Sequence, residues 1–472
     1  MKPYIRSGIL KYVIADVIST LIGWMVFFVF RKVYIEDFSF SDIKILVADK
    51  QFFLGIVIIP FGWVLMFWML GFYTNIYRKS RINELAKTFL VIALGVIVLF
   101  FAVMLDDRIV DYRDYYIAVG FLLILQFLIT GLFRSVVLNN AKRQLTNKKV
   151  GFNTLIIGGN TRAIEIYNEI TKDNFQGYNV VGFVDTNGNS TNGLAAHLPC
   201  LGKLLQLQEL IHKYDVEEVV IAIETSEHPR LNNIINLLVN RNVIIKLIPD
   251  TFDILSGSAR MNHLLGAAFI EIYPELMSQW QYNFKRLTDI FASVTVLIIL
   301  SPVYLFCIFR IVFSANGKIF YKQERIGLHG KPFTIYKFRS MIEGAEKNGP
   351  ALSSHDDDRI TPFGKVMRKW RLDELPQFFN VLRGEMSLVG PRPERQFFID
   401  QLVQLTPDYV NIQRAKPGIT SYGMVKFGYA SAVDEMVQRM KFDLLYIENM
   451  SLMLDFKIML YTVKTIWQGK GK

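Results

Sequence analysis

The stretch IFASVTVLIILSPVYLFCIF, residues 290–309, contains 20 uncharged residues with the pair Ser301 and Pro302 near its middle. A helix of ~20 apolar residues is long enough to cross the hydrocarbon core of a bilayer. A central proline breaks the helical hydrogen-bond ladder, and the Ser301 hydroxyl can satisfy a freed backbone group. Lysines and arginines flank both ends, which disfavours moving either flank across the membrane. We therefore predict a re-entrant helix over residues 287–312 that bends at Ser301 and Pro302 and returns to the same face. A kinked full span is the alternative.

Four further apolar runs lie upstream of this stretch, at residues 12–30, 51–77, 88–105 and 115–133. Asp16 is the one charged residue within them. Each run is near the length of a membrane-spanning helix, and the first lacks the small-residue cleavage site of a signal peptide. The composition agrees, because 51% of the residues are hydrophobic and 20% are charged. The sequence therefore predicts a four-helix transmembrane bundle over residues 1–140.

The basic residues beside these runs predict the orientation of the bundle. Twelve lysines and arginines, among them Lys79 and Arg134, flank one side, against six on the other. Since the more basic side stays in the cytoplasm, both ends of the bundle and everything after it are predicted to be cytoplasmic. The net charge of +11 is interpreted as contact with anionic lipid or phosphorylated substrates, and no stacking motif for nucleic acid accompanies it. The two cysteines, Cys200 and Cys307, form neither a disulfide framework nor a metal-site spacing.

From about Gly151, short β-rich runs alternate with amphipathic helical stretches. This alternation predicts an α/β Rossmann-like domain with a parallel sheet over residues 141–265, followed by a linker over 266–284. The turn from Gly158 to Ala163 occupies the place of a dinucleotide fingerprint, with Asp185 ending a later strand, but the full glycine spacing is absent. A structural or regulatory module and a ligand-binding domain both stay open. His212, His228 and His263 have no partner at metal spacing.

The last part of the chain carries dense motifs in which arginines and lysines recur beside glycine and proline. The motifs are YKQERIGLHGKPFTIYKFRSM (321–341), DDDRITPFGKVMRKWRLDELPQFFNVLRGEMSLVGPRPE (356–394) and KPGITSYGMVKFG (416–428). Rigid turns would hold these cations in fixed positions, which suits recognition of a polyphosphate. We interpret the triplet Asp356, Asp357 and Asp358 as a solvated loop, because three successive carboxylates rarely converge on one ion.

These strings resemble the bacterial sugar transferase family, the monotopic polyprenyl-phosphate phosphoglycosyl transferases of the undecaprenyl-phosphate glucose or galactose phosphotransferase type. The resemblance runs in order through Ser301 and Pro302, KFRSM, LDELPQ, MSLVGPRP and KPGIT. The whole chain is similar to the large members of the family. The expected fold is therefore a membrane α-helical bundle, an α/β Rossmann-like domain and an α-rich monotopic catalytic domain with a re-entrant membrane helix, over residues 285–472.

The resemblance implies transfer of a sugar 1-phosphate from a UDP-sugar to polyprenyl phosphate, with release of UMP, through a covalent aspartyl-phosphosugar intermediate. It implies Mg²⁺ as cofactor, the start of surface polysaccharide synthesis, and a place in the bacterial inner membrane with the catalytic domain facing the cytoplasm. It is also compatible with a homodimer. The implied nucleophile is Asp373, and the implied metal ligand is Glu374.

The residues around this pair offer physical reasons for such roles. Splitting a diphosphate needs an ionised nucleophile and cations that neutralise the phosphates. Arg368, Lys369 and Arg371 would favour the charged form of a nearby carboxylate. Pro376 is tolerated only in the first turn of a helix, which places Asp373 and Glu374 at a helix N-terminus. Adjacent side chains on a helix diverge by about 100°, which favours separate roles for the two carboxylates.

Further substrate-binding candidates are cations in the same motifs. Arg392, between two prolines, is the strongest candidate for a phosphate clamp. Arg325, Lys337, Arg339 and Arg395 come second, with surface cations against lipid headgroups as the alternative reading of these four. Lys416, in KPG, resembles a conserved family turn near the nucleotide. The following residues, SYGMV, depart from the commoner GWAQV pattern of the family.

Two other functions are alternatives to the one that the family resemblance implies. A membrane-bound nucleotide-sugar dehydratase or epimerase would need an intact glycine fingerprint and a Tyr-x-x-x-Lys base, and no tyrosine between residues 151 and 284 has lysine four residues later. A non-enzymatic membrane scaffold would tolerate the loss of the charge on Asp373. The C-terminal run, residues 440–467, is interrupted by charges, so we expect it to lie on the membrane surface or close the catalytic core rather than span.

Overall fold

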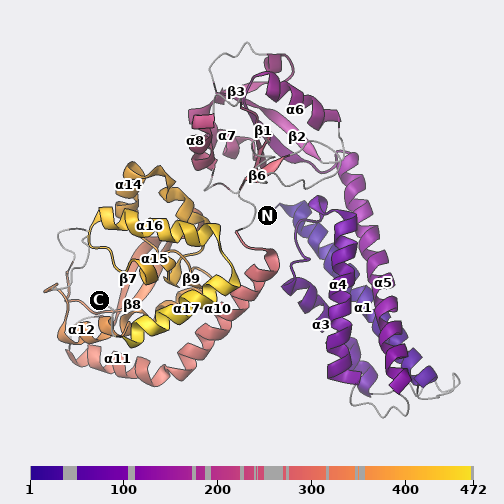
Figure 1. Ribbon diagram of the computed structural model, residues 1–472, viewed down its shortest axis with the longest axis horizontal. Helices are drawn as coiled ribbons and strands as arrows, with labels where there is room; N and C mark the ends of the chain where they lie inside the picture. Colours follow the sequence, from indigo (N-terminus) through magenta and orange to yellow (C-terminus); the bar gives the residue numbers. More distant parts are fainter. Residues whose placement is uncertain are drawn as a thin grey trace. The chain divides into compact units, whose positions relative to one another are not determined.

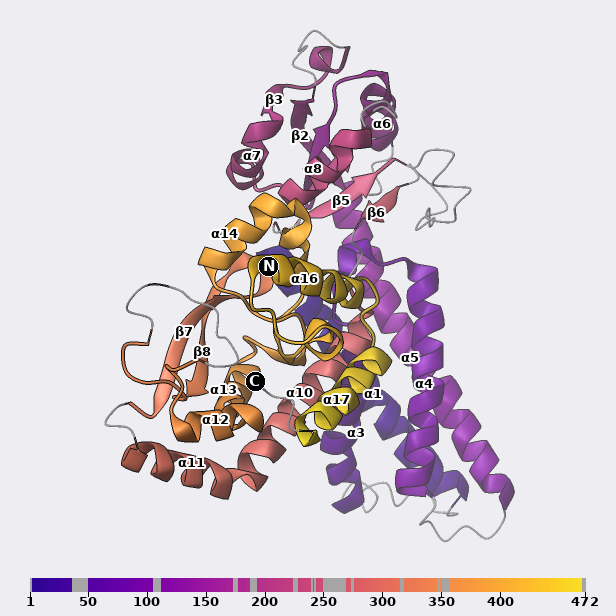
Figure 2. The ribbon, with the colours of Figure 1, turned by 60° about the vertical axis from the view of Figure 1, so that its left-hand side comes forward.

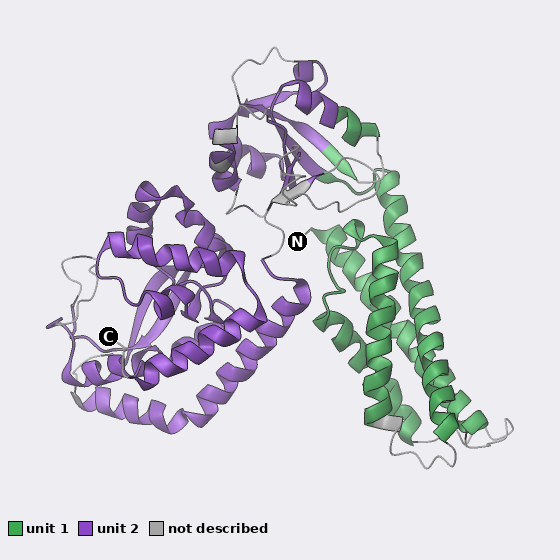
Figure 3. Ribbon diagram, viewed as in Figure 1, with its two compact units in different colours: residues 1–152, 167–179 green, residues 153–166, 180–472 purple. Residues whose placement is uncertain are grey.

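The computed structural model describes residues 2–35, 50–104, 112–172, 177–186, 193–223, 228–238, 241, 243–248, 269–272, 276–314, 318–345, 349 and 357–468. The chain divides into two compact units, residues 1–152 with 167–179 and residues 153–166 with 180–472 (Figure 3). Much of the predicted linker, together with His263 and Asp356, lies outside the described residues.

The first unit consists mainly of four long helices, α1 (Pro3–Phe30), α3 (Lys50–Met69), α4 (Arg81–Leu99) and α5 (Tyr112–Thr146) (Figure 1). Each is long and apolar enough to cross a membrane. Large apolar side chains such as Val57, Phe61 and Leu90 are more than half exposed, as expected of a surface that faces lipid. The apolar runs of the sequence thus form a helical bundle, and the chain is a membrane protein.

A buried ion pair lies at the centre of this bundle. Arg134 on α5 donates from Nε and Nη2 to the two oxygens of Asp16 on α1, each at 2.8 Å, and from Nη1 to the Thr88 hydroxyl on α4 at 2.6 Å. Lys79 pairs with the buried Glu84. Arg134 and Lys79 flank the apolar runs in the sequence, but their side chains are nearly or fully buried in the structure. Helix α5 extends well past the apolar run, so Arg134 points into the bundle and pairs with Asp16, the one charge of the first apolar run.

A six-stranded sheet follows, in the order β3-β2-β1-β4-β5-β6. The strands are β1 (Phe152–Ile157), β2 (Tyr178–Asp185), β3 (Cys200–Lys203), β4 (Glu218–Ile221), β5 (Ile244–Leu247) and β6 (Ile270–Ile272), and the helices are α6 (Thr161–Lys172), α7 (Leu207–Lys213) and α8 (His228–Leu238). The pairs β1–β4, β2–β3 and β4–β5 are parallel, which confirms the predicted parallel α/β sheet.

Two local features of this sheet refine the sequence prediction. Gly158 ends β1 with φ +125°, and a Cβ there would lie 2.4 Å from the Ala222 carbonyl oxygen, so only glycine fits beside β4. Strand β6 pairs antiparallel with β5. Residues 270–272 were placed in the predicted linker, and they instead form the edge of the sheet, because a three-residue strand leaves no periodic signal.

The C-terminal domain begins with two apolar helices, α10 (Gln279–Ile299) and α11 (Ser301–Ser314), that meet at a bend of 61°. The Ser301 hydroxyl donates to the Ile298 carbonyl oxygen at 2.8 Å, as expected for a group that satisfies the broken ladder. The bend lies at Leu300, directly before Ser301 and Pro302. Both a re-entrant hairpin and a broken span have this geometry, so the re-entrant helix stays a prediction.

The rest of the domain packs small sheets among short helices (Figure 2). The strands are β7 (Phe320–Ile326) and β8 (Pro332–Phe338), which form a hairpin, and β9 (Ser387–Val389) and β10 (Gly418–Thr420), which are parallel. The helices are α12 (Pro362–Lys369), α13 (Gln377–Arg383), α14 (Gln396–Leu405), α15 (Tyr422–Lys426), α16 (Val433–Glu448) and α17 (Leu452–Trp467). The predicted C-terminal run becomes α16 and α17. On α17, Asp455 and Ile458 face the core, whereas Phe456, Leu460 and Trp467 are exposed.

Candidate functional site

Asp373 and Glu374 lie in a 3-10 turn, Leu372–Glu374, directly before α13. Side chains one residue apart in a 3-10 turn diverge by about 120°, so the two carboxylates point in different directions. Arg371 begins the turn with φ +54°, a left-handed conformation that is uncommon for a residue other than glycine. Such strain persists where the surrounding structure requires it, often at functional sites. Here it turns the chain between α12 and the carboxylate pair.

Three cations from separate segments surround the Glu374 carboxylate. Lys337 Nζ on β8 lies 3.0 Å from Oε1, Arg392 Nη1 lies 3.8 Å from the same oxygen, and Arg371 Nη1 lies 3.5 Å from Oε2. Burial alone would raise the pKa of Glu374, but Lys337, Arg371 and Arg392 outweigh it and hold the pKa below its usual range. Glu374 is therefore a buried carboxylate that stays ionised.

Asp373 has the opposite electrostatic environment. Its side chain is buried, and no described residue donates a hydrogen bond to its carboxylate. Burial and the adjacent Glu374 raise the pKa of Asp373, although Lys337, Arg368 and Arg371 partly oppose them. The nearby cations do favour the charged form, as the sequence predicted, but the cost of removing this carboxylate from water is larger. A desolvated carboxylate without hydrogen bonds keeps its lone pairs available for attack.

Arg392 follows β9 in the turn Gly390-Pro391-Arg392-Pro393 and reaches Glu374, and its role as a phosphate clamp stays a prediction. Its guanidinium lies 5.3 Å above the Tyr429 ring, and the Arg371 guanidinium lies 5.4 Å from the same ring. Arg392 Nη1 also contacts the Met424 sulfur at 2.9 Å. One aromatic ring thus contacts both arginines that flank Glu374. Sequence reasoning missed Tyr429, which lies one residue after the motif of residues 416–428.

The candidate cations that come second to Arg392 have different surroundings from one another. Lys337 is at Glu374, as described above. Arg325 pairs with Glu394 at 3.3 Å, and Glu394 also accepts from Arg439 at 2.6 Å. Burial lowers the pKa of Arg325, and the positive charges of Arg392 and Arg395 add to this effect. Arg325, Arg392 and Arg395 therefore form one basic cluster beside Glu394.

Among the described residues, Arg339 and Lys416 form no ion pair with Glu374, unlike Lys337, Arg371 and Arg392. Arg339 Nη1 lies 3.7 Å from Glu343 and has no hydrogen-bond acceptor among the described residues. Lys416 lies at the other end of α13, where its ammonium nitrogen is 3.9 Å from the position of a Cβ on Gly384. It lines a separate cavity to which neither Asp373 nor Glu374 contributes.

The oxygen atoms of the site decide whether it could hold the predicted Mg²⁺. Glu374 Oε2 is buried and accepts no hydrogen bond from a described residue, so one carboxylate oxygen is available as a ligand. Across the described ranges no group of three or more His, Cys, Asp or Glu side chains could hold a metal ion. The protein would therefore supply one or two carboxylate oxygens, with the other ligands from phosphate and water, which is how Mg²⁺ usually binds. The residues fit Mg²⁺ that arrives with a diphosphate.

Asp357 belongs to neither a metal site nor a solvated loop. Its two oxygens accept from Arg359 Nε at 2.8 Å and Nη2 at 2.7 Å, and the side chain is buried. The hydrogen bond from Arg359 lowers the pKa of Asp357 to about 2. The predicted solvated loop is wrong for this residue, because a basic residue two positions later folds back on it. Asp358 is exposed.

Asp443 on α16 connects two of the motifs. Its carboxylate accepts a hydrogen bond from the Gly423 N–H at 2.8 Å, and it also accepts from the Arg392 N–H and the Ser421 hydroxyl. It thereby ties the Arg392 turn to the start of α15. Burial raises the pKa of Asp443 to about 6, although Arg439 and these hydrogen bonds oppose the shift. Sequence reasoning missed this residue, since Asp443 belongs to no motif and its partners Gly423 and Arg392 lie on other segments of the chain.

Two protein families and several individual proteins are similar to this chain. The family described as bacterial sugar transferase matches residues 280–469, and the family described as CoA-binding domain matches residues 68–249. The UDP-glucose:undecaprenyl-phosphate glucose-1-phosphate transferase of Klebsiella pneumoniae is 28% identical over 447 residues, which cover 90% of this chain and 93% of that protein.

Two other relatives match a smaller share of the chain at higher identity. An uncharacterized sugar transferase of Bacillus subtilis is 38% identical over 187 residues, which are 40% of this chain and 89% of that protein. The UDP-N-acetylgalactosamine-undecaprenyl-phosphate N-acetylgalactosaminephosphotransferase of Aeromonas hydrophila is 40% identical over 228 residues, which are 48% of this chain and 52% of that protein. The chain thus spans about half the length of the latter relative.

The environment of Asp443 leads to a prediction for the pH dependence of stability. A carboxyl group whose pKa is higher in the folded state contributes stability below its unfolded pKa of ~3.9, and this contribution is lost as pH rises through about 6. Relative to Asp443→Asn, the wild type should lose on the order of 3 kcal/mol of stability between pH 4 and pH 7. Thermal unfolding of both proteins in one detergent at several pH values measures this difference.

The matched control for this prediction is Asp434→Asn, which neutralises an exposed aspartate on the same helix. This control should follow the wild type at every pH. A constant difference between wild type and Asp443→Asn across the range would contradict the raised pKa.

Proposed function

Because the chain belongs to the bacterial sugar transferase family, we propose that it transfers a sugar 1-phosphate from a UDP-sugar to polyprenyl phosphate and releases UMP. The names of the Klebsiella pneumoniae and Aeromonas hydrophila relatives support this reaction class. The product would be the first lipid-linked intermediate of a surface polysaccharide. We further propose that the protein lies in the bacterial inner membrane with the Asp373 site on the cytoplasmic side.

The observation that carries this proposal is the contrast between two adjacent carboxylates. Glu374 is held ionised by three cations, whereas Asp373 is buried beside it and accepts no hydrogen bond from the residues that the structure describes. A diphosphate needs both elements, a cluster of positive charge for its oxygens and a nucleophile aimed at phosphorus. The reaction of a dehydratase or epimerase does not require such a pair of carboxylates in the C-terminal domain.

In the proposed first step, an Asp373 oxygen attacks the phosphorus that carries the sugar. A carboxylate oxygen–phosphorus bond forms while the bond from that phosphorus to the bridging oxygen of the diphosphate breaks, and UMP leaves with the bridging oxygen. In the second step, a phosphate oxygen of polyprenyl phosphate attacks the same phosphorus. The bond to Asp373 breaks, the sugar is left on a polyprenyl diphosphate, and the carboxylate is regenerated.

The surrounding residues have distinct tasks in these steps. Lys337, Arg371 and Arg392 bind and orient the diphosphate oxygens around Glu374, since arginine grips phosphate with paired donors and lysine acts as a point charge. When bound at Glu374, Mg²⁺ would neutralise part of the charge on the diphosphate. The basic cluster beside Glu394 offers further positive charge for the UMP that leaves.

Access for the lipid is supported by contacts of the bent apolar helices. The Tyr304 hydroxyl on α11 donates to the Leu375 carbonyl oxygen at 2.6 Å, one residue after Glu374. Phe306 on α11 also packs edge-on against Phe363 at the start of α12. The carboxylate pair is therefore attached to the apolar helix, so a phosphate at the depth of lipid headgroups can reach Asp373.

The test of the proposed function is a turnover assay. Full-length protein in lipid nanodiscs, given Mg²⁺, polyprenyl phosphate and a panel of UDP-sugars, should release UMP and form a lipid-linked sugar with at least one donor. Asp373→Asn should slow the reaction by at least about 10³-fold, because it removes the nucleophile. Asp400→Asn, an exposed carboxylate of α14, is the matched control and should keep the rate. Turnover by Asp373→Asn at the native rate would refute the proposed role.

The contact of Tyr429 with both arginines gives a second prediction. A cation–π contact is worth about 0.5–2 kcal/mol, which is about 2- to 30-fold, so removal of a ring that contacts two arginines should lower kcat/KM for the UDP-sugar by at least about fivefold. Tyr429→Leu removes the ring, whereas Tyr429→Phe keeps it and should lose much less. Steady-state kinetics with varied UDP-sugar measure both variants. If the two are equally impaired, the hydroxyl rather than the ring positions the arginines.

A further inference from the structure

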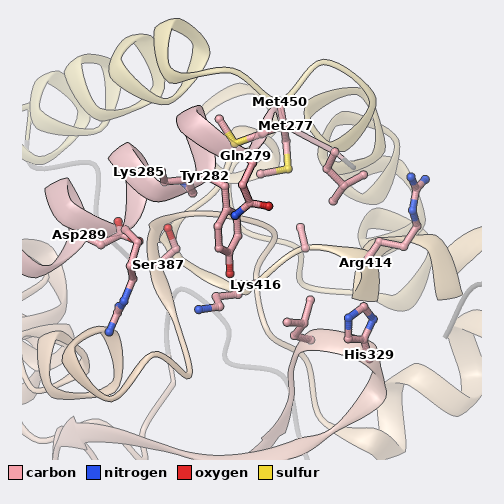
Figure 4. Close-up of a pocket in the computed structure, with 14 residues that line it drawn as sticks. Met277, Gln279, Tyr282, Lys285, Asp289, His329, Ser387, Arg414, Lys416 and Met450 are labelled. Carbon is pink, nitrogen blue, oxygen red and sulfur yellow. The ribbon is translucent and has the colours of Figure 1, made fainter. Parts of the chain in front are cut away.

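A cavity of about 260 Å³ lies in the C-terminal domain, apart from the carboxylate pair (Figure 4). Its lining includes Tyr282, Arg286, Lys416 and Met277, while Asp373, Glu374 and Arg392 are absent from it. Small-molecule sites usually begin at about 300 Å³. The cavity therefore suits a ligand of headgroup size rather than a whole nucleotide sugar.

The cavity and the carboxylate pair lie at opposite ends of the same elements. Ser387 at the start of β9 and Lys416 just before β10 line the cavity, whereas Arg392 follows the end of β9. Parallel strands place their starts at one edge and their ends at the other. Helix α13, whose seven residues span about 10 Å at 1.5 Å per residue, likewise separates Glu374 before its start from Gly384 at its end. A ligand in the cavity thus occupies a separate site.

Two of the cations in the cavity lack a carboxylate partner. Lys285 pairs with Asp455 at 2.6 Å, and Arg414 pairs with Glu448 at 2.9 Å. Within the described part of the chain, Arg286 and Lys416 form no such pair. A partly desolvated cation without a counter-charge is unfavourable, so an anion bound here would be stabilised.

These two cations converge on one glycine. A Cβ on Gly384 would lie 3.5 Å from Arg286 Nη2 and 3.9 Å from Lys416 Nζ. Arg286 donates to the carbonyl oxygens of Val381 and Leu382 at 2.6 and 2.8 Å, and its five N–H groups leave donors for a further acceptor. The two side chains thus border one small space that a tetrahedral anion can occupy.

Part of the remaining wall is apolar or aromatic, and the lining also includes Gln279, Ser387, His329 and the carboxylate of Asp289, which accepts a hydrogen bond from the Leu388 N–H. The Lys416 ammonium lies 5.8 Å from the centre of the Tyr282 ring, and Figure 4 shows these two side chains meeting within the cavity. Leu276, Met277 and Met450 also line it. A ligand for this site combines an anionic group with a flat or apolar moiety.

We propose that this cavity is a second, non-catalytic site for a phosphate monoester that carries an apolar or aromatic group. The phosphate binds between Arg286 and Lys416, and the apolar part packs on Tyr282 and Met277. A nucleoside monophosphate and a lipid phosphate share this chemistry. The site goes beyond the proposed transferase reaction and does not depend on it.

The test is a binding measurement in which the transferase site is disabled. Full-length Arg392→Gln in phosphatidylcholine nanodiscs, which lacks the candidate phosphate clamp, is titrated by calorimetry with UMP and, separately, with farnesyl phosphate. At least one of the probes should bind at one site per chain. Adding Lys416→Gln should weaken this binding by at least about tenfold, the usual effect of losing a hydrogen bond to a charged group. Adding Lys416→Arg should retain it.

Controls separate a lost site from a lost fold. Lys441→Gln changes an exposed lysine of α16 and should bind like its parent. Tyr282→Leu removes the aromatic wall and should also weaken binding, which tests the site if Lys416→Gln does not fold. The probe that binds identifies the source, nucleotide or lipid. No binding of either probe to Arg392→Gln, or equal binding by its Lys416→Gln derivative, would overturn the inference even if the wild type is an active transferase.

Discussion

The ionic contacts of Glu374 with Lys337, Arg371 and Arg392 are the constraint on which the site depends. They join a β-hairpin, a strained turn and a proline-flanked turn around one buried carboxylate. Two carboxylates face at least three cations there, so the cluster carries a net positive charge. A buried cluster of this kind is costly unless an anion completes it. The site is therefore organised for a substrate that brings several negative charges, as a diphosphate does.

The same contacts explain why two adjacent carboxylates behave differently. The cations approach Glu374 and bring its pKa down, while Asp373 is buried and its pKa goes up. The left-handed Arg371 and the 3-10 turn separate the two side chains in direction. Attachment of Leu375 to Tyr304 on α11 then links this pair to the apolar helices. Residues 371–375 thus contain the strained turn, the carboxylate that binds the cations and the contact with the apolar helix.

Much of this could be predicted from sequence, because long apolar runs and spaced motifs are local signals. The four apolar helices, the parallel α/β sheet and the interruption of the last apolar run at Ser301 were all predicted. Contacts between distant segments were not. Arg134 was counted as a flanking charge because its partner Asp16 lies 118 residues away. Tyr429 and Asp443 were missed because each acts on Arg392 through the fold, and the raised pKa of Asp373 depends on burial that no motif encodes.

Central to this account is a carboxylate that becomes covalently bonded to phosphorus. The most direct measurement is the mass of the intact protein after incubation with a UDP-sugar and Mg²⁺ in the absence of lipid, followed by peptide mapping. The account predicts that UMP is released in at most one equivalent, that the protein gains one sugar phosphate, and that the modified residue is Asp373. Asp373→Asn should gain no mass. An unmodified protein that nevertheless turns over when polyprenyl phosphate is added would contradict the account and favour direct attack by the lipid.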